Sequence, residues 1–287
     1  MKESFRTWKP NKSSLIILEK INAILEHYRG LRIKVTLRQL YYQLVSKAII
    51  PNEQRQYKML GSLLSKARMA GLVDWDIIED RGRRPHIIQD FVDLNDLVSD
   101  AVGYFRLPRW DDQENYVELW TEKDAISSVL EPITSRLHLP LIVNKGYSST
   151  TAMKDAADRI KAQDKEAHIL YLGDLDPSGE DMVRDIEERL YEFDVTDFTM
   201  TKIALNPKQV KHYKLPTNPV KITDSRHQGF MDKFGEHCYE VDAIPPEELQ
   251  LIVTKAIEAL MDMDAFNDVL AEEDVLREKL QEHTKEL

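Results

Sequence analysis

The chain has 287 residues, a length that favours two modest domains or one large domain. Its composition, 42% hydrophobic and 31% charged, excludes a mainly disordered or collagen-like chain. The longest apolar run, residues 15–18, is far shorter than the roughly 18 residues of a membrane helix, and no signal-peptide stretch opens the sequence. We therefore expect a cytoplasmic protein without membrane contacts. A single cysteine excludes an intrachain disulfide, and no His or Cys spacing is typical of a zinc site.

The charge is divided unevenly along the chain. Residues 1–90 carry 17 Lys and Arg against 9 Asp and Glu, a net charge of +8, whereas the remainder carries −19. A basic first third on an acidic body is typical of one nucleic-acid-binding domain attached to another domain. Ordinary variation of surface charge is the alternative explanation.

The first ninety residues show the pattern of a small helical domain. Helical spacing of apolar residues predicts three helices, over residues 14–28, 37–48 and 55–71. Thr36 is a favourable N-cap for the second of them. Apolar alternation predicts a strand over residues 73–77, and residues 80–85 are typical of a turn. Together these elements predict a winged helix-turn-helix domain over residues 1–90.

A helix over residues 87–105 and a linker that ends at residue 112 are expected next. Beyond them strand and helix signals alternate, with strands expected over residues 116–120, 139–143, 168–172 and 198–204. This alternation predicts βαβ units, a mainly parallel sheet and therefore the α/β class, in a Rossmann-like domain over residues 113–250. The acidic tail, residues 251–287, is expected to be helical and to serve packing or oligomer contacts.

Acidic residues follow two of the expected strands. Asp174 and Asp176 come directly after the third strand, and their i, i+2 spacing places both on one side of an extended segment. Two carboxylates on one side repel each other unless a cation lies between them, and Mg²⁺ prefers oxygen ligands. Glu122 follows the first strand and offers a third carboxylate. Capping of the next helix is the alternative explanation for Asp176, and a place in the first helical turn for Glu122.

These acidic motifs resemble those of the Toprim domain, which topoisomerases, bacterial-type primases and some nucleases share. Residues 143–148 are similar to the glycine turn that lies between the two motifs. Residues 36–42, Thr-Leu-Arg-Gln-Leu-Tyr-Tyr, resemble the tyrosine motif of the type IIB DNA topoisomerase (topoisomerase VI) A subunit and its meiotic break-forming relative. Residues 240–246 resemble a segment that follows Toprim in these A subunits. In length the chain is closest to the abbreviated mini-A homologues.

The two tyrosines of this motif differ in their expected surroundings. On a helical wheel Tyr41 belongs to the apolar stripe of its helix, whereas Tyr42 lies roughly 100° away. Arg38 lies one turn before Tyr42 on the same side. We therefore expect Tyr41 to be buried and Tyr42 to be exposed beside a cation.

The resemblance implies a DNA transesterase that makes double-strand breaks in a Mg²⁺-dependent reaction, with Mn²⁺ as a substitute. Tyr42 would be the nucleophile that forms a 5′-phosphotyrosyl bond, assisted by Arg38. The metal ligands would be Glu122, Asp174 and Asp176, with Glu122 also taking part in catalysis. The resemblance implies a homodimer as well, in which the tyrosine of one protomer meets the Toprim acids of the other. The sequence contains no GxxxxGK[ST] phosphate loop, so strand passage would require a separate GHKL-type ATPase subunit.

The third helix and the following turn carry the expected contacts to double-stranded DNA. These are side chains of the phosphate-contacting type, Arg55, Lys58, Ser62 and Lys66 on the helix and Arg81, Arg83 and Arg84 at the turn. A solvated charged surface is the alternative explanation. Two other functions stay open: a Toprim nuclease that hydrolyses DNA without covalent attachment, and a non-catalytic DNA-binding component.

Overall fold

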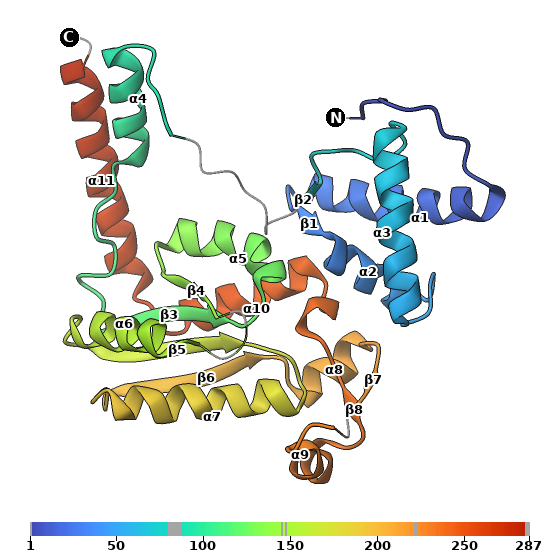
Figure 1. Cartoon of the computed structure of the whole chain (residues 1–287). Helices are drawn as coiled ribbons and strands as arrows, with labels where there is room; N and C mark the ends of the chain where they lie inside the picture. Colours follow the sequence, from blue (N-terminus) through green and yellow to red (C-terminus); the bar gives the residue numbers. More distant parts are fainter. Residues whose placement is uncertain (1, 80–87, 145, 147, 221–222, 285–287) are drawn as a thin grey trace.

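The computed structural model describes residues 2–79, 88–144, 146, 148–220 and 223–284 (Figure 1). Its N-terminal part contains the three expected helices, α1 (Lys12–Gly30), α2 (Leu37–Ser46) and α3 (Gln54–Met69). Thr36 caps α2 as predicted: its hydroxyl accepts a hydrogen bond from Gln39 N at 3.3 Å, and Gln39 Oε1 accepts one from Thr36 N at 2.7 Å. This capping box fixes where the helix that carries Tyr42 begins.

The strand expected over residues 73–77 is wrong. The short strand β2 (Ile78–Glu79) begins only after it and pairs in parallel with β1 (Val35–Thr36). Asp74 bends the preceding segment, because its carboxylate accepts hydrogen bonds from Asp76 N at 2.8 Å and from Arg29 at 2.6 Å. The turn expected over residues 80–85 lies outside the described residues, so the wing of the predicted winged helix is not shown.

The four strands expected in the second half are confirmed and form one parallel sheet. They are β3 (Asn115–Thr121), β4 (Leu141–Val143), β5 (Glu166–Leu172) and β6 (Phe198–Ala204), in the order β4-β3-β5-β6. The chain is therefore an α/β protein with a mainly parallel sheet. In this arrangement the carboxyl ends of β3 and β5, in register at Thr121 and Leu172, lie side by side.

Helices cover both faces of this sheet, which explains the nearly continuous apolar sequence of its central strands. Val117 and Leu119 of β3 belong to the same buried cluster as residues of α5 (Asp124–Leu137) and α10 (Pro246–Glu258). Trp120, on the other face, belongs with α6 (Thr150–Lys161) and α7 (Pro177–Glu192). Alternate residues of one strand thus contribute to two cores.

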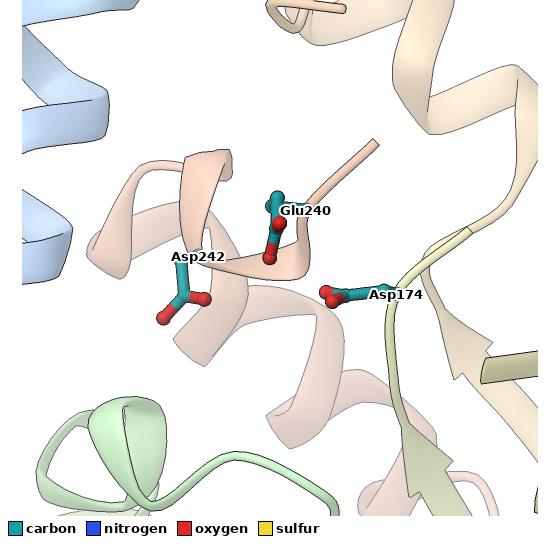
Figure 2. Close-up of side chains that lie close together, drawn as sticks. All are labelled: Asp174, Glu240 and Asp242. Atoms are coloured by element: carbon teal, nitrogen blue, oxygen red, sulfur yellow. The ribbon is translucent and has the colours of Figure 1, made fainter. Parts of the chain in front are cut away.

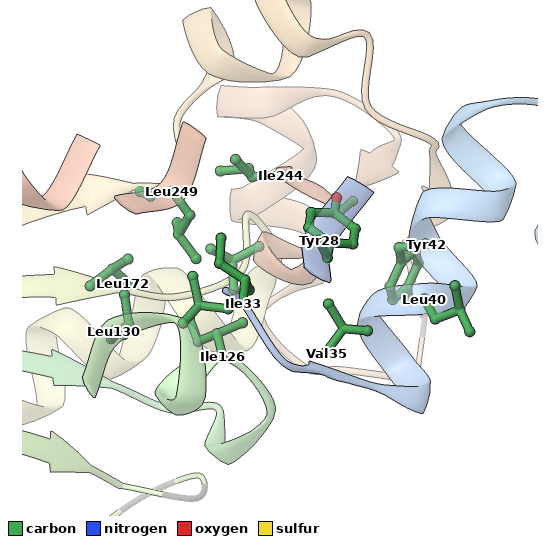
Figure 3. Packing of buried hydrophobic residues seen from close by; sticks show 14 of the residues in the cluster. Tyr28, Ile33, Val35, Leu40, Tyr42, Ile126, Leu130, Leu172, Ile244 and Leu249 are labelled. Atoms are coloured by element: carbon green, nitrogen blue, oxygen red, sulfur yellow. The ribbon is translucent and has the colours of Figure 1, made fainter. Parts of the chain in front are cut away.

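The segment that follows β6 returns toward the N-terminal helices. It consists of short elements, α8 (Pro207–Tyr213), β7 (Asn218–Pro219), α9 (His227–Phe234), β8 (His237–Cys238) and the 3₁₀ helix η2 (Val241–Ala243). Here η2 packs against α2, and α10 packs against α5. Figure 3 shows the resulting shared core, in which Tyr28, Val35 and Leu40 of the N-terminal part continue into Ile126 and Leu249 of the sheet domain.

Two helices extend away from the sheet side by side, α4 (Leu94–Tyr104) and α11 (Met263–Thr284) (Figure 1). The helix expected over residues 87–105 is thus shorter than predicted. It begins at Leu94 because the Asp93 carboxylate accepts a hydrogen bond from Asp96 N at 2.9 Å. Across the described part of the chain, no helix combines the length and apolarity that a bilayer span requires.

Candidate functional site

Three carboxylates meet between the end of β5 and the start of η2 (Figure 2). Asp174, Glu240 and Asp242 each offer an oxygen within 4.8 Å of the others, and we call these three residues the acid cluster. Two contacts hold the distant segments together. Leu175 and Tyr239 form an antiparallel bridge, and Asp174 Oδ1 accepts a hydrogen bond from Val241 N at 2.8 Å. The backbone itself therefore fixes the position of the acid cluster.

A lysine ammonium lies inside the acid cluster. Lys123 Nζ is 2.5 Å from Asp174 Oδ2 and 3.0 Å from Asp242 Oδ2, and it also donates to Glu240 Oε2. Its side chain is only 13% exposed. Burial alone would lower the pKa of Lys123, but Asp242, Asp174 and Glu240 outweigh that effect and raise this pKa well above its usual value. The ammonium therefore stays charged and neutralises part of the cluster.

The carboxylates of the acid cluster respond differently to their surroundings. Burial raises the pKa of Asp174 well above its ordinary value, against the opposing charge of Lys123. Burial also acts on Glu240, but Lys123 and Arg38 prevail and lower its pKa to about 2. Asp242 is 1% exposed, and its Oδ1 has no hydrogen-bond partner within the described residues. An orphaned carboxylate oxygen beside two further carboxylates suits a hard cation, so this site could hold a metal ion.

The predicted metal ligands Glu122 and Asp176 lie close to this site but outside the acid cluster. Glu122 Oε1 accepts a hydrogen bond from Asp174 N at 3.2 Å, and burial raises the pKa of Glu122. Asp176 caps α7, since its Oδ1 accepts a hydrogen bond from Gly179 N at 2.7 Å. The capping function of Asp176 is thereby confirmed. A metal shared by Glu122, Asp174 and Asp176 stays a prediction, because Asp174 is the only one of these predicted ligands that also belongs to the acid cluster.

Arg38 connects the acid cluster to the tyrosine helix. Its Nε donates to Asp242 Oδ2 at 2.9 Å and its Nη2 to Glu240 Oε2 at 2.5 Å. The same guanidinium lies 5.6 Å from the ring centroid of Tyr42. Burial opposes the charge, yet Asp242 and Glu240 raise the pKa of Arg38. The predicted cation beside Tyr42 is thus confirmed.

The expected exposure of Tyr42 is wrong. Its relative exposure is 7%, because η2 packs against the face of α2 that a wheel of the isolated helix leaves open to solvent. This burial, together with the nearby charge of Glu240, raises the pKa of Tyr42. Tyr41 is buried as predicted, and its hydroxyl donates to Asn52 Oδ1 at 3.0 Å.

A cleft of about 620 Å³ borders both parts of the site. Arg38, Tyr41, Tyr42 and Tyr57 from the N-terminal helices line it together with residues of the sheet domain and the following segment, among them Asp176, Ser178, Asp224, Tyr239 and Glu240. The predicted nucleophile and one predicted metal ligand therefore face the same cleft within one chain.

Three residues of the site were not among the predicted ones: Lys123, Glu240 and Asp242. Glu240 and Asp242 repeat the i, i+2 spacing of Asp174 and Asp176, a signal that could have singled them out. Nothing local distinguishes Lys123, whose position depends on the return of η2 to the end of β5.

The surface of α3 has the predicted orientation. Leu60, Leu63, Leu64 and Ala67 are buried, whereas the predicted DNA contacts Arg55, Lys58, Ser62 and Lys66 are exposed. The other three predicted contacts, Arg81, Arg83 and Arg84, lie outside the described residues. Contact with DNA itself stays a prediction.

A scan of the sequence against protein-family models matched no family, and a search of curated proteins found no matching relative. A functional interpretation must therefore start from the residues of the site. Their chemistry combines a phenol, two buried or half-buried cations and five neighbouring carboxylates, and the phenol, Arg38 and two of the carboxylates line one cleft.

Proposed function

We propose that the chain is a DNA-cleaving transesterase similar to the type IIB topoisomerase A subunit, with a winged-helix-like N-terminal part and a Toprim-like sheet domain. The observation that carries the proposal is the contact of Arg38 with both halves of the site. It binds Glu240 and Asp242 of the segment that borders the sheet, and its guanidinium lies against the ring of Tyr42. Arg38 thereby links the proposed phenol nucleophile to a set of acids that could bind a cation.

The proposed reaction conserves the energy of the phosphodiester bond. Tyr42 Oη attacks a backbone phosphorus, the Oη–P bond forms and the P–O3′ bond breaks; the phenol proton leaves, and the 3′ oxygen takes up a proton. A phenol with a raised pKa is a weak nucleophile at neutral pH, so it requires assistance. Arg38 is placed to stabilise the negative charge that develops at the phosphate.

The acids would hold Mg²⁺, or Mn²⁺ in its place, with Asp174 as the central ligand. Glu122 accepts a hydrogen bond from Asp174 N, whereas Glu240 and Asp242 belong with Asp174 to the acid cluster. When bound, the metal would neutralise charge on the phosphate and the leaving oxygen. Double-stranded DNA would contact the exposed polar side of α3. A homodimer and a separate GHKL-type ATPase subunit complete the proposal for a full topoisomerase reaction.

The burial of Tyr42 favours one alternative, a metal-dependent nuclease in which water replaces the tyrosine. In that reaction the acids and Arg38 would keep their functions, and the N-terminal helices would only bind DNA. A non-catalytic DNA-binding component would have no use for acids clustered beside the tyrosine helix.

A covalent protein–DNA adduct distinguishes these functions. The full chain is incubated with plasmid DNA and Mg²⁺ or Mn²⁺, denatured with detergent and tested for DNA that remains attached to protein. We expect an adduct in the wild type and in Tyr41→Phe, which should only lose stability, and none in Tyr42→Phe. Cleavage without an adduct would favour the nuclease. An adduct that survives Tyr42→Phe, or that maps to Tyr57, would overturn the assignment of the nucleophile.

A further inference from the structure

Lys123 occupies the place where the acid cluster would bind a cation. We infer that its ammonium is an internal counter-ion, which leaves the acid cluster when a divalent metal ion binds there. This inference rests on the proposed metal-dependent function, and it adds a defined movement of one side chain to it.

The contacts of Lys123 show how completely its ammonium fills the place of a bound cation. An ammonium has three N–H donors, and here they face three acceptors, Oδ2 of Asp174, Oδ2 of Asp242 and Oε2 of Glu240. Lys123 is the N-cap residue of α5 and makes no side-chain capping bond, so the start of this helix does not depend on its side chain. Its flexible stem can therefore leave the cluster without unwinding the helix.

The acid cluster offers more ligand atoms than one ammonium can use. Oδ1 of Asp242 is buried without a hydrogen-bond partner in the described part of the chain. An ammonium donates only three hydrogen bonds, whereas Mg²⁺ or Mn²⁺ carries twice its charge and commonly takes six oxygen ligands. A divalent ion that Asp242 binds through both carboxylate oxygens would thus satisfy the oxygen that Lys123 leaves unpaired. A protonated lysine cannot itself be a metal ligand, so the two cations compete for one place.

Arg38, the second cation of the site, does not occupy the place of a metal ion. It binds Glu240 and Asp242 from the outer side, through the two nitrogens of a planar fork, and its side chain is 40% exposed. It does not contact Asp174 in the described structure. The exchange therefore concerns Lys123, while Arg38 keeps the tyrosine helix attached to the cluster.

The wild-type protein provides the first test. The full chain without DNA is exposed briefly to an amine-methylating reagent, with and without Mn²⁺, and labelling of each lysine is measured by peptide mass spectrometry. Lys202 is the matched control: it is 14% exposed and donates to the backbone carbonyl oxygen of Asp174 and to Glu180, and it contacts no carboxylate of the acid cluster among the described contacts. We expect Mn²⁺ to accelerate labelling of Lys123 at least fivefold and to leave Lys202 unchanged. Unchanged protection of Lys123 while calorimetry shows bound Mn²⁺, or an absence of Mn²⁺ binding, would overturn the inference.

A second test uses Lys123→Met, which removes the competing charge and keeps an unbranched side chain only one atom shorter. Mn²⁺ should bind this variant at least tenfold more tightly than the wild type, whereas Lys202→Met should change the affinity less than threefold. Structural damage would weaken binding, so the direction of the change separates the two explanations. Equal or weaker binding to a folded Lys123→Met would contradict the exchange. If Lys123→Met folds only with Mn²⁺ present, that dependence supports the exchange. If the variant does not fold at all, the labelling of the wild type decides whether the exchange occurs.

The outcome is independent of the proposed cleavage chemistry. Release of Lys123 by Mn²⁺ without any DNA adduct would retain the exchange and reject the transesterase. An adduct formed while Lys123 stays protected would retain the transesterase and reject the exchange.

Discussion

Two buried charge clusters of this protein differ in how completely their charges are paired. In the tail cluster the single carboxylate of Glu273 joins α11 to the segment after α4. It accepts hydrogen bonds from Arg109 Nε at 3.1 Å, Arg109 Nη2 at 2.7 Å and Leu107 N at 3.0 Å, and Arg277 pairs with it as well. In the acid cluster three carboxylates face two cations, and Asp242 Oδ1 stays without a partner among the described residues.

The difference indicates which of the two clusters could accept a ligand. Both oxygens of Glu273 are satisfied by groups of the chain, and its pKa is lowered to about 2, because the hydrogen bonds and charges of its partners prevail over burial. Such a set has no place for another ion and stabilises the attachment of the tail. The acid cluster leaves one buried carboxylate oxygen unpaired among the described residues, so it could hold an additional cation.

The largest expected effect concerns Asp174, which belongs both to the acid cluster and to the metal ligands predicted from the sequence. Asp174→Asn should abolish DNA cleavage, because it removes the proposed central metal ligand. It should leave DNA affinity within about twofold, because the proposed DNA contacts lie on α3. Gel cleavage assays and fluorescence anisotropy measure the two quantities. Asp164→Asn, at an exposed position, is the control. Retained cleavage in Asp174→Asn would show that the acid cluster is not catalytic.

The tail cluster should instead determine stability. Glu273→Gln removes a buried charge and leaves Arg109, which is 7% exposed, without its ion pair. We expect a loss of about 3 kcal/mol in the free energy of unfolding at pH 7, with DNA cleavage unchanged at temperatures where the variant is folded. Urea unfolding measures the loss, and Glu272→Gln, an exposed neighbour, should cost less than about 0.5 kcal/mol.

The pH dependence of this loss has a definite sign. The pKa of Glu273 is lowered from 4.5 in the unfolded chain to about 2 in the folded state. The charge of Glu273 therefore stabilises the fold fully when the pH is above the pKa of the unfolded chain, and this stabilisation disappears as the pH falls toward the pKa of the folded state. The difference between the wild type and Glu273→Gln should therefore shrink between pH 4.5 and pH 2. A difference that stays constant over this range would mean that packing, not charge, explains the loss.

A smaller effect is expected from the exposed side of α3. Reversing Lys58 and Lys66 to Glu should weaken DNA binding about tenfold near physiological salt, and should flatten the slope of log affinity against log salt by about 0.9 for each lost phosphate contact. Reversal of Lys208 and Lys211, exposed on α8, is the control. An unchanged slope would indicate that α3 faces something other than DNA.

The smallest effect separates capping from metal binding at Asp176. Asp176→Ala should cost about 0.5–2 kcal/mol of stability, because Gly179 N loses its acceptor, whereas Asp176→Asn keeps an acceptor and should cost less. Thermal unfolding measures both variants. If Asp176→Asn nevertheless loses Mn²⁺ binding, the carboxylate is a ligand as well as a cap.

The sequence predicted the sheet well and the site only in part, for a physical reason. Strands buried on both faces are visible as short apolar runs, and residues 198–204 matched β6 at both ends. The capping of α2 by Thr36 is equally local. In contrast, the acid cluster depends on a bridge between Leu175 and Tyr239, residues far apart in the chain, and the burial of Tyr42 depends on the same returning segment. Local periodicity contains no information about such contacts.

The central claim is that the acid cluster is a cation site and not a structural ion-pair network. Calorimetric titration of the wild-type chain with Mg²⁺ and Mn²⁺, with and without DNA, together with melting temperatures, tests it most directly. We predict saturable binding heat and a melting temperature that rises with metal concentration, because the ion binds the folded site and not the dispersed chain. Glu273→Gln should show the same heat. Absence of binding heat from the wild type under both conditions would contradict the account and would place the acid cluster in the same structural class as the tail cluster.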